Sequence, residues 1–334
     1  MIELIAFIIL FLLGIITIIS ENNGILRYIY IPSLVLFMVI VRVNGFYLGG
    51  YQEDIITYGV EMKYMSFDIY YLREFVFWYT LHLVYLVTHS EFITFLVFDF
   101  LWIHILLRTL KQNTSNKLGR GLIVILATSF PFFFGYENIY RQFFASILLV
   151  YSYIIIKESP SRSFKLFLLS IFIHNLSLFI IPILIMRKFF YFKLEDRIFL
   201  SLSSSVIIAI AIPLMLFLKA TGATIFNYSF LYLSLFLFFS LFFVFKFKEN
   251  VYLIVQKIPS LIPVTILISG FVFFKQELIA ERIGMFFIIF FIVDLYNYST
   301  TIQSKLNRIW FRCFILLLFT LPVFMFSSSM LYLK

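Results

Sequence analysis

Charged residues and cysteines are scarce in this sequence. Only 13% of the 334 residues are charged, whereas 63% are apolar and the mean hydropathy is +1.03. A water-soluble domain cannot bury so large an apolar fraction, so the composition predicts an all-α polytopic membrane protein with the lipid bilayer as a partner. The one cysteine, Cys313, excludes an intramolecular disulfide and a cysteine-based metal site or redox pair.

Sequence motifs of several enzyme classes are also absent. The chain has no GxxxxGK[ST] phosphate loop, no HExxH, no GxSxG elbow and no His/Cys cluster with zinc spacing. These absences argue against a nucleotide-driven pump and a zinc protease, and we expect neither a metal nor another cofactor. The net charge of +9 is explained by basic loops facing an anionic cytoplasmic leaflet, so no nucleic-acid partner is expected.

Apolar runs recur along the whole chain and predict about ten to twelve transmembrane helices, since one span needs about 20 apolar residues. These runs cover residues 2–20, 26–43, 75–88, 91–107, 121–135, 142–156, 164–186, 198–218, 225–245, 258–274, 283–299 and 309–331. The first run lacks a basic n-region and an A-x-A-like cleavage site, so we expect a retained helix rather than a signal peptide. With no internal repeat visible, residues 1–334 are expected to form a single integral membrane domain.

The charges of the connections predict their sides of the membrane. Residues 44–74 form a polar stretch rich in tyrosine and acidic residues, which indicates a long extracytoplasmic loop. The connection RTLKQNTSNKLGR carries only basic charges and is therefore expected in the cytoplasm. KESPSRSFK and the basic segment 305–312 are expected on the same side.

Two runs do not fit as straight spans. Residues 75–88 are short for a crossing and are expected to be re-entrant or interfacial. A straight helix over residues 164–186 would place the basic stretches 187–197 and 246–257 outside the cell. A helix broken near His174 would avoid this, because non-helical backbone is tolerated where it lines a watered cavity.

The strongest candidate cluster lies in FFFGYENIYRQFFASILLVY. Charged side chains at membrane depth cost about 2.5–3.5 kcal/mol, so each needs a partner, a cavity or a function. Glu137 and Arg141 are four residues apart, with Asn138 and Gln142 beside them. On one helix this spacing places a carboxylate, a guanidinium and two amides near one face. The alternative is an interfacial ion pair that anchors a helix end.

Further polar residues interrupt other apolar runs. His174 in IFIHNLSLFI is either a hydrogen-bonded packing residue or a proton acceptor. Glu281 and Arg282 gather at the entrance of a late apolar run, where snorkelling to the interface is the alternative. Asp99 and Asp294 are expected to pair with cations on neighbouring helices or to mark a proton path.

Three motifs in order resemble the EpsG/Wzy group of bacterial polysaccharide polymerases. They are GGYQEDIITY, IYRQFFASI and AERIGMFF, and the resemblance extends over about residues 40–300. FIHNLS is similar to the family's histidine motif, with its serine three residues after the histidine instead of two. The resemblance implies transfer of a growing glycan from undecaprenyl diphosphate to the non-reducing end of a lipid-linked oligosaccharide repeat unit. The implied location is the bacterial inner membrane, with the active site facing the periplasm.

Arginines are the expected diphosphate-binding residues, because guanidinium forks match phosphate oxygens in bidentate geometry. Arg141 and Arg282 are expected to bind the diphosphate, with Arg73 and Arg42 as helpers. To bind one diphosphate, Arg141 and Arg282 must converge in a water-filled cavity that is open to the outer leaflet.

Other residues are expected to remove a proton or to bind sugar. The candidates for the base are Asp54, Glu137 and His174. Tyr58 and its neighbours in the loop either stack on sugar rings or form an interfacial aromatic belt. Gln142 or Asn138 is expected to orient sugar hydroxyls, and Glu281 is expected to contribute to substrate binding.

Three other functions are alternatives to a lipopolysaccharide-type polymerase. An O-antigen ligase is chemically closest to it. A lipid-linked oligosaccharide flippase should show two similar halves, which this sequence does not. A membrane O-acyltransferase needs a histidine–arginine site near the inner side, and the first helices contain no histidine. A polymerase would have a chain-length regulator and a flippase as partners.

Overall fold

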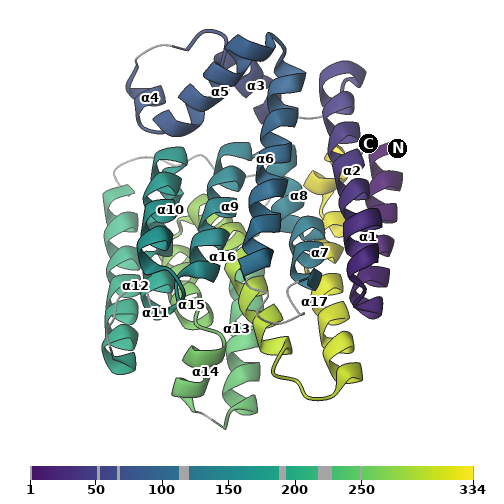
Figure 1. Cartoon of the computed structure of the whole chain (residues 1–334). Coiled ribbons are helices and arrows are strands. Elements are labelled where there is room, and N and C mark those ends of the chain that lie inside the picture. Colours follow the sequence, from purple (N-terminus) through teal and green to yellow (C-terminus); the bar gives the residue numbers. More distant parts are fainter. Residues whose placement is uncertain are drawn as a thin grey trace. The chain divides into compact units, whose positions relative to one another are not determined.

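The computed structural model describes residues 2–50, 53–65, 68–112, 120–187, 193–216, 228–248 and 250–333. Every regular element within these ranges is helical (Figure 1). Helices satisfy their backbone hydrogen bonds internally, as a hydrocarbon environment demands. Six helices in the described ranges are long and apolar enough to cross a membrane, which indicates a multi-pass membrane protein.

Within the described ranges, fewer helices are long and apolar enough to span a membrane than the ten to twelve expected from the sequence. The described residues contain six, or up to seven if α14 (Val251–Lys257) and α15 (Leu261–Phe273), which are bent by 96°, count as one span. Other apolar runs are divided between short helices. The run at 121–135 forms α7 (Arg120–Thr128) and α8 (Phe130–Glu137). The structure thus shows six or seven candidate spans in the described ranges, and the further spans expected from the apolar runs stay a prediction.

The two runs that did not fit as straight spans form short elements. α5 (Phe75–Thr88) has 14 residues. At 1.5 Å per residue it is about 21 Å long, less than the roughly 30 Å hydrocarbon core, and its interfacial placement stays a prediction. α10 (Pro160–Ile173) ends before His174, and a 3₁₀-helix (Asn175–Ile180) and α11 (Ile181–Arg187) follow. The helix is therefore broken at His174, as expected, whereas the depth of this break in a bilayer stays a prediction.

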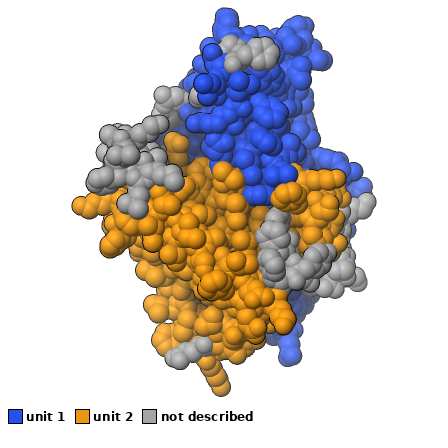
Figure 2. Space-filling model, turned by 90° about the vertical axis from the view of Figure 1, so that its left-hand side faces the viewer, with its two compact units in different colours: residues 1–151, 166–175, 299–334 blue, residues 152–165, 176–298 orange. Residues whose placement is uncertain are grey.

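The chain packs as two compact units, which Figure 2 shows in different colours. The first unit comprises residues 1–151, 166–175 and 299–334, and the second comprises residues 152–165 and 176–298. Each contact described below lies within one unit.

Long apolar helices form the body of the first unit. They are α1 (Ile2–Ser20), α2 (Ile31–Val43), α6 (Glu91–Gln112) and α17 (Lys305–Met325), with the short α18 (Ser327–Tyr332) after α17. α1 packs against α2, α7 and α17. π-helical turns extend α2 into one continuous helix over Ile25–Leu48. The next residue, Gly49, has a φ of 77°, a left-handed conformation that favours glycine and terminates this helix.

The polar segment 44–74 also contains helices. α3 (Glu53–Glu61) and α4 (Ile69–Leu72) lie within it. α4 packs against α5, and α5 packs against α6. In Figure 1, α3, α4 and α5 lie together at the upper end of α6. The extracytoplasmic placement of this segment stays a prediction, but the segment supplies two residues of the candidate site, Tyr58 on α3 and Glu74 before α5.

The second unit consists of closely packed apolar helices. Besides α11, α14 and α15 it contains α12 (Leu194–Leu216), α13 (Ser229–Lys246) and most of α16 (Glu277–Ser299). α15 packs against α12 and α13. A Cβ atom built on Gly270 of α15 would lie 2.5 Å from Cβ of Ala209 on α12. Such small residues let two apolar helices approach closely.

Candidate functional site

A buried carboxylate joins a guanidinium and an imidazole in the first unit. Glu74, directly before α5, has a side chain that is only 1% exposed. Its Oε2 accepts a hydrogen bond of 2.5 Å from Nη1 of Arg141, in the first turn of α9 (Tyr140–Ile155). Its Oε1 lies 2.7 Å from Nδ1 of His174, at the break after α10. Glu74 therefore holds together two functional groups that are distant in the sequence.

The charge on Glu74 determines the tautomer of His174. Burial raises the pKa of Glu74, but the hydrogen bond and charge of His174 and the charges of Arg141 and Arg73 outweigh it and lower this pKa below its usual value. An ionised carboxylate only accepts hydrogen bonds, so Nδ1 of His174 donates the proton. In a neutral imidazole Nε2 then carries the lone pair, and within the described chain it has no hydrogen-bond partner.

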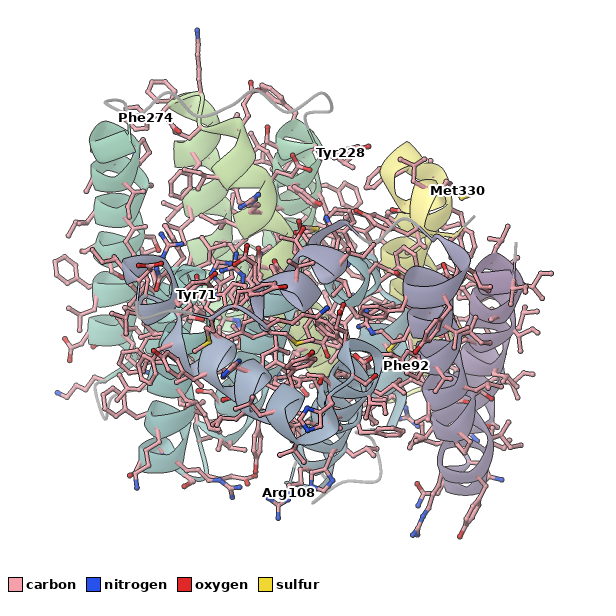
Figure 3. All side chains as sticks on the ribbon, turned by 90° about the horizontal axis from the view of Figure 1, so that it is seen from above. Tyr71, Phe92, Arg108, Tyr228, Phe274 and Met330 are labelled. Carbon is pink, nitrogen blue, oxygen red and sulfur yellow. The ribbon has the colours of Figure 1, made fainter. Side chains whose placement is uncertain are left out.

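Two aromatic rings hold Arg141 in place. Its guanidinium lies 5.1 Å from the ring centroid of Tyr58 on α3 and 5.1 Å from that of Trp78 on α5. The two rings are themselves in an edge-to-face contact at 5.6 Å. The ring of Tyr71, which is labelled in Figure 3, packs edge-to-face against Trp78 with the ring centroids 5.2 Å apart. Its hydroxyl donates a hydrogen bond to Glu61. Cation–π contacts of this kind orient a guanidinium without neutralising it.

Glu74, Arg141, His174, Tyr58 and Trp78 are called the Glu74 cluster below. Two of its side chains are partly exposed to solvent, Arg141 to 17% and His174 to 18%. A buried acid with two partly exposed partners is an arrangement that can present a base and a cation to a ligand.

Asp54 and Asn138, two expected site residues, meet beside this cluster. The backbone N–H of Asp54, in the first turn of α3, donates to Oδ1 of Asn138 at 3.3 Å. Asn138 lies in the link between α8 and α9, three residues before Arg141. The contact thus ties α3 to the segment that carries Arg141, and both residues are half-buried.

The prediction that Glu137 and Arg141 share one helix is wrong. α8 ends at Glu137 and α9 begins at Tyr140, and Asn138 between them has φ −131° and ψ −69°, outside the helical region. The side chain of Glu137 is fully buried, and that of Gln142 is 4% exposed. The break turns Arg141 away from an i,i+4 pairing, so that Glu74 becomes its partner.

Sequence reasoning missed Glu74 and Trp78 as site residues. Both lie next to or within the short run 75–88, which was expected to be re-entrant or interfacial and not to cross the membrane. A carboxylate that directly precedes an interfacial segment was the available signal, but nothing in the sequence pairs it with Arg141 or His174. Arg73 is exposed, and its charge acts on the adjacent Glu74.

Arg42, an expected diphosphate helper, lies inside the first unit. Its side chain is 0% exposed and forms a bidentate salt bridge with Asp99. Nε lies 2.7 Å from Oδ2, and Nη2 lies 3.0 Å from Oδ1. Tyr140 and Trp102 also donate to Oδ1 of Asp99, at 2.8 and 3.1 Å. The expected pairing of Asp99 with a cation is confirmed. In this position Arg42 stabilises the packing of α2 on α6 rather than facing a ligand.

The second unit contains the other two expected site residues. Glu281 is half-buried and Arg282 is exposed, both near the start of α16. Burial raises the pKa of Glu281 to about 7, although the charge of Arg282 opposes this shift. Because the two units are described separately, the expected convergence of Arg141 and Arg282 stays a prediction.

Asp294 is the buried acid of the second unit. It accepts hydrogen bonds from the hydroxyl of Tyr153 at 2.7 Å, from Oγ of Ser260 at 2.6 Å and from the backbone N–H of Ser260 at 2.9 Å. Nη1 of Arg187 lies 3.3 Å from its Oδ1. The expected pairing of Asp294 with a cation on a neighbouring helix is therefore confirmed as well.

No group of three or more His, Cys, Asp or Glu side chains in the described ranges could hold a metal ion. In comparisons with known proteins, no family model, no curated protein and no solved structure matches the chain. The functional interpretation therefore rests on the geometry of the Glu74 cluster, and the family resemblance stays a prediction.

Proposed function

We propose that the chain is a membrane glycosyltransferase that polymerises a bacterial polysaccharide from a polyprenyl-diphosphate-linked donor. The observation that carries this proposal is the position of Glu74, which bonds Nδ1 of His174 with one oxygen and Arg141 with the other. A proton acceptor and a cation are thereby held on one carboxylate. Glycosyl transfer to a hydroxyl from a diphosphate leaving group requires both.

The proposed reaction uses each group once. Nε2 of His174 removes the proton from an acceptor sugar hydroxyl while that oxygen forms a bond to the anomeric carbon of the donor. The bond between the anomeric carbon and the diphosphate oxygen breaks, and undecaprenyl diphosphate leaves with the bonding electron pair. The guanidinium charge of Arg141 stabilises the charge that develops on this leaving group. Glu74 orients the imidazole and stabilises its protonated form, as buried carboxylates do in other acid–base pairs.

The proposed setting is the outer face of the bacterial inner membrane. The donor and acceptor would both be lipid-linked oligosaccharides, and a chain-length regulator and a flippase would work with the enzyme. The acidic segment 44–74, which the positive-inside rule assigns to the outer face, contributes α3 and Glu74 to the cluster. The role of Arg282 as a diphosphate ligand stays a prediction.

An oriented imidazole also separates the alternatives. A flippase moves its substrate without breaking a covalent bond, so it needs no proton acceptor. A ligase that attaches a finished glycan to another lipid would use the same two groups as a polymerase, and the length of the glycan in cells distinguishes the two. A membrane O-acyltransferase would require the cluster to open toward the inner side, opposite to the side that the loop charges favour.

The test is the length of the surface glycan in a deletion strain that carries plasmid copies of the gene. Arg141→Lys keeps the charge and loses the fork, and His174→Gln keeps a polar side chain and loses the base, so both should leave single-unit caps with normal membrane expression. Arg108→Lys and His104→Gln are matched controls, because both side chains are exposed on α6. Long chains from the Arg141→Ala strain would exclude Arg141 from the site. Loss of single units as well as long chains would favour a flippase.

A further inference from the structure

A cationic pocket lies in the second unit, apart from the Glu74 cluster. Its volume is about 360 Å³, at the lower end of the range for small-molecule sites, roughly 300–1,000 Å³. The lining residues are Lys157, Met186, Arg187, Leu194, Arg197, Val255, Gln256, Lys257 and Pro259. All of them belong to the second unit. None of them has a role in the proposed transfer reaction.

Four positive charges converge on this pocket, and none of its described lining residues is acidic. Lys157 follows α9, Arg187 ends α11, Arg197 lies in the first turn of α12 and Lys257 ends α14. The fold thus brings together cations from four elements although like charges repel one another. Asp294, the partner of Arg187 at 3.3 Å, neutralises part of this charge.

Both pocket arginines, Arg187 and Arg197, have an Nε–H group that is buried without an acceptor in the described chain. Nη1 of Arg187 faces Asp294 and its guanidinium lies 4.6 Å from the ring centroid of Tyr153, but its Nε is buried without a hydrogen-bond partner in the described chain. Nη1 of Arg197 reaches only the carbonyl of Met186, at 3.4 Å, and its Nε is likewise buried without a described partner. Buried donors without acceptors are costly, so an acceptor-rich anion would be favoured here.

We propose that this pocket binds the phosphate group of an anionic ligand. Two guanidinium forks and two ammonium groups match the oxygens of a phosphate or diphosphate, and the apolar side chains of Met186, Leu194 and Val255 line the same space. The ligand is either the headgroup of an anionic phospholipid or a free diphosphate. The basic stretches that supply these cations lie at 157–165, 187–197 and 246–257, and such stretches favour the anionic cytoplasmic leaflet.

The experiment uses the full chain purified in detergent and two probes. Sodium pyrophosphate is titrated by calorimetry, and retention of phosphatidylglycerol relative to phosphatidylcholine is measured by native mass spectrometry. Arg197→Gln and Lys257→Gln remove pocket charges, and Lys165→Gln is the matched control because this exposed lysine of the same unit does not line the pocket. Each pocket variant should bind about tenfold more weakly, and the control should bind like wild type.

The two probes distinguish the sources of the phosphate. Weaker pyrophosphate binding in the pocket variants alone supports a soluble ligand, and selective loss of phosphatidylglycerol from them supports a lipid headgroup. The proposal is overturned if wild type binds neither probe, or if the control loses as much binding as the pocket variants. Elution volume and melting temperature report folding, and Arg197→Lys replaces Arg197→Gln if the latter does not fold, since it removes only the fork.

Discussion

The charge of Glu74 should stabilise the first unit, and Glu74→Gln measures how much. The substitution keeps the shape of the side chain, but an amide has one acceptor oxygen where the carboxylate bonds Arg141 at 2.5 Å and His174 at 2.7 Å. A hydrogen bond to a charged group contributes about 1.5–3 kcal/mol and a neutral one about 0.5–1.5 kcal/mol. The substitution removes one of the two hydrogen bonds to Arg141 and His174 and removes the carboxylate charge from the other. Both partner side chains are partly exposed, so water offsets part of the loss. We therefore expect a loss of about 2–3 kcal/mol in the free energy of unfolding.

The pH dependence of this loss follows from the lowered pKa of Glu74. A group with a lower pKa in the folded state contributes stability above its unfolded pKa, about 4.3 for a glutamate, and this contribution disappears as the pH falls through the folded pKa. Wild type should therefore lose more stability between neutral and strongly acidic pH than Glu74→Gln does. At sufficiently low pH the two proteins should converge.

The assay is the melting temperature of the detergent-solubilised protein, followed by tryptophan fluorescence from neutral to strongly acidic pH. Glu195→Gln is the matched control, because Glu195 is an exposed carboxylate at the start of α12. The same strains should show that Glu74→Gln, unlike this control, abolishes long glycan. Equal melting temperatures of Glu74→Gln and wild type across the whole pH range would refute the engagement of Glu74 by Arg141 and His174.

Two further predictions concern packing. Asp99→Asn should lower the free energy of unfolding by about 3–5 kcal/mol, because it leaves the guanidinium of Arg42 buried without a full counter-charge. In a double-mutant cycle, Arg42→Met should cost less stability in the Asp99→Asn protein than in wild type. Strictly additive losses of stability would contradict the pairing. Gly270→Val should lower the free energy of unfolding by about 1–3 kcal/mol, because a Cβ atom at position 270 would lie 2.5 Å from Cβ of Ala209. An unchanged melting temperature would show that α12 and α15 do not pack as described.

The two buried aspartates, Asp99 and Asp294, follow the same physical rule. Asp99 and Asp294 each accept a hydrogen bond from a tyrosine hydroxyl and each lie beside an arginine, Arg42 and Arg187 respectively. A carboxylate in an apolar bundle is tolerated only when cations and donors surround it. The sequence allowed this pairing or a proton path, because a charged side chain in an apolar run needs a partner or a function. The identity of each partner required the packing of the helices.

The sequence predicted parts of the candidate site but not its organisation. Arg141 and His174 were selected because a charge or an imidazole in an apolar run needs a reason to be there. Glu74 was not selected, since an acid in a polar segment is ordinary. It lies 67 residues from Arg141 and 100 from His174 in the sequence, so no local spacing relates it to either residue.

By itself, the sequence determined that the chain is helical and belongs in lipid, because apolar composition and length depend on no tertiary contact. It also located the break at His174, where polar residues interrupt an apolar run. Only the tertiary structure decided which runs stay whole and which polar groups meet. Helix ends such as that at Glu137 depend on the backbone of a few residues, and the pairing of Glu74 with Arg141 depends on how α3, α5 and α9 pack against one another.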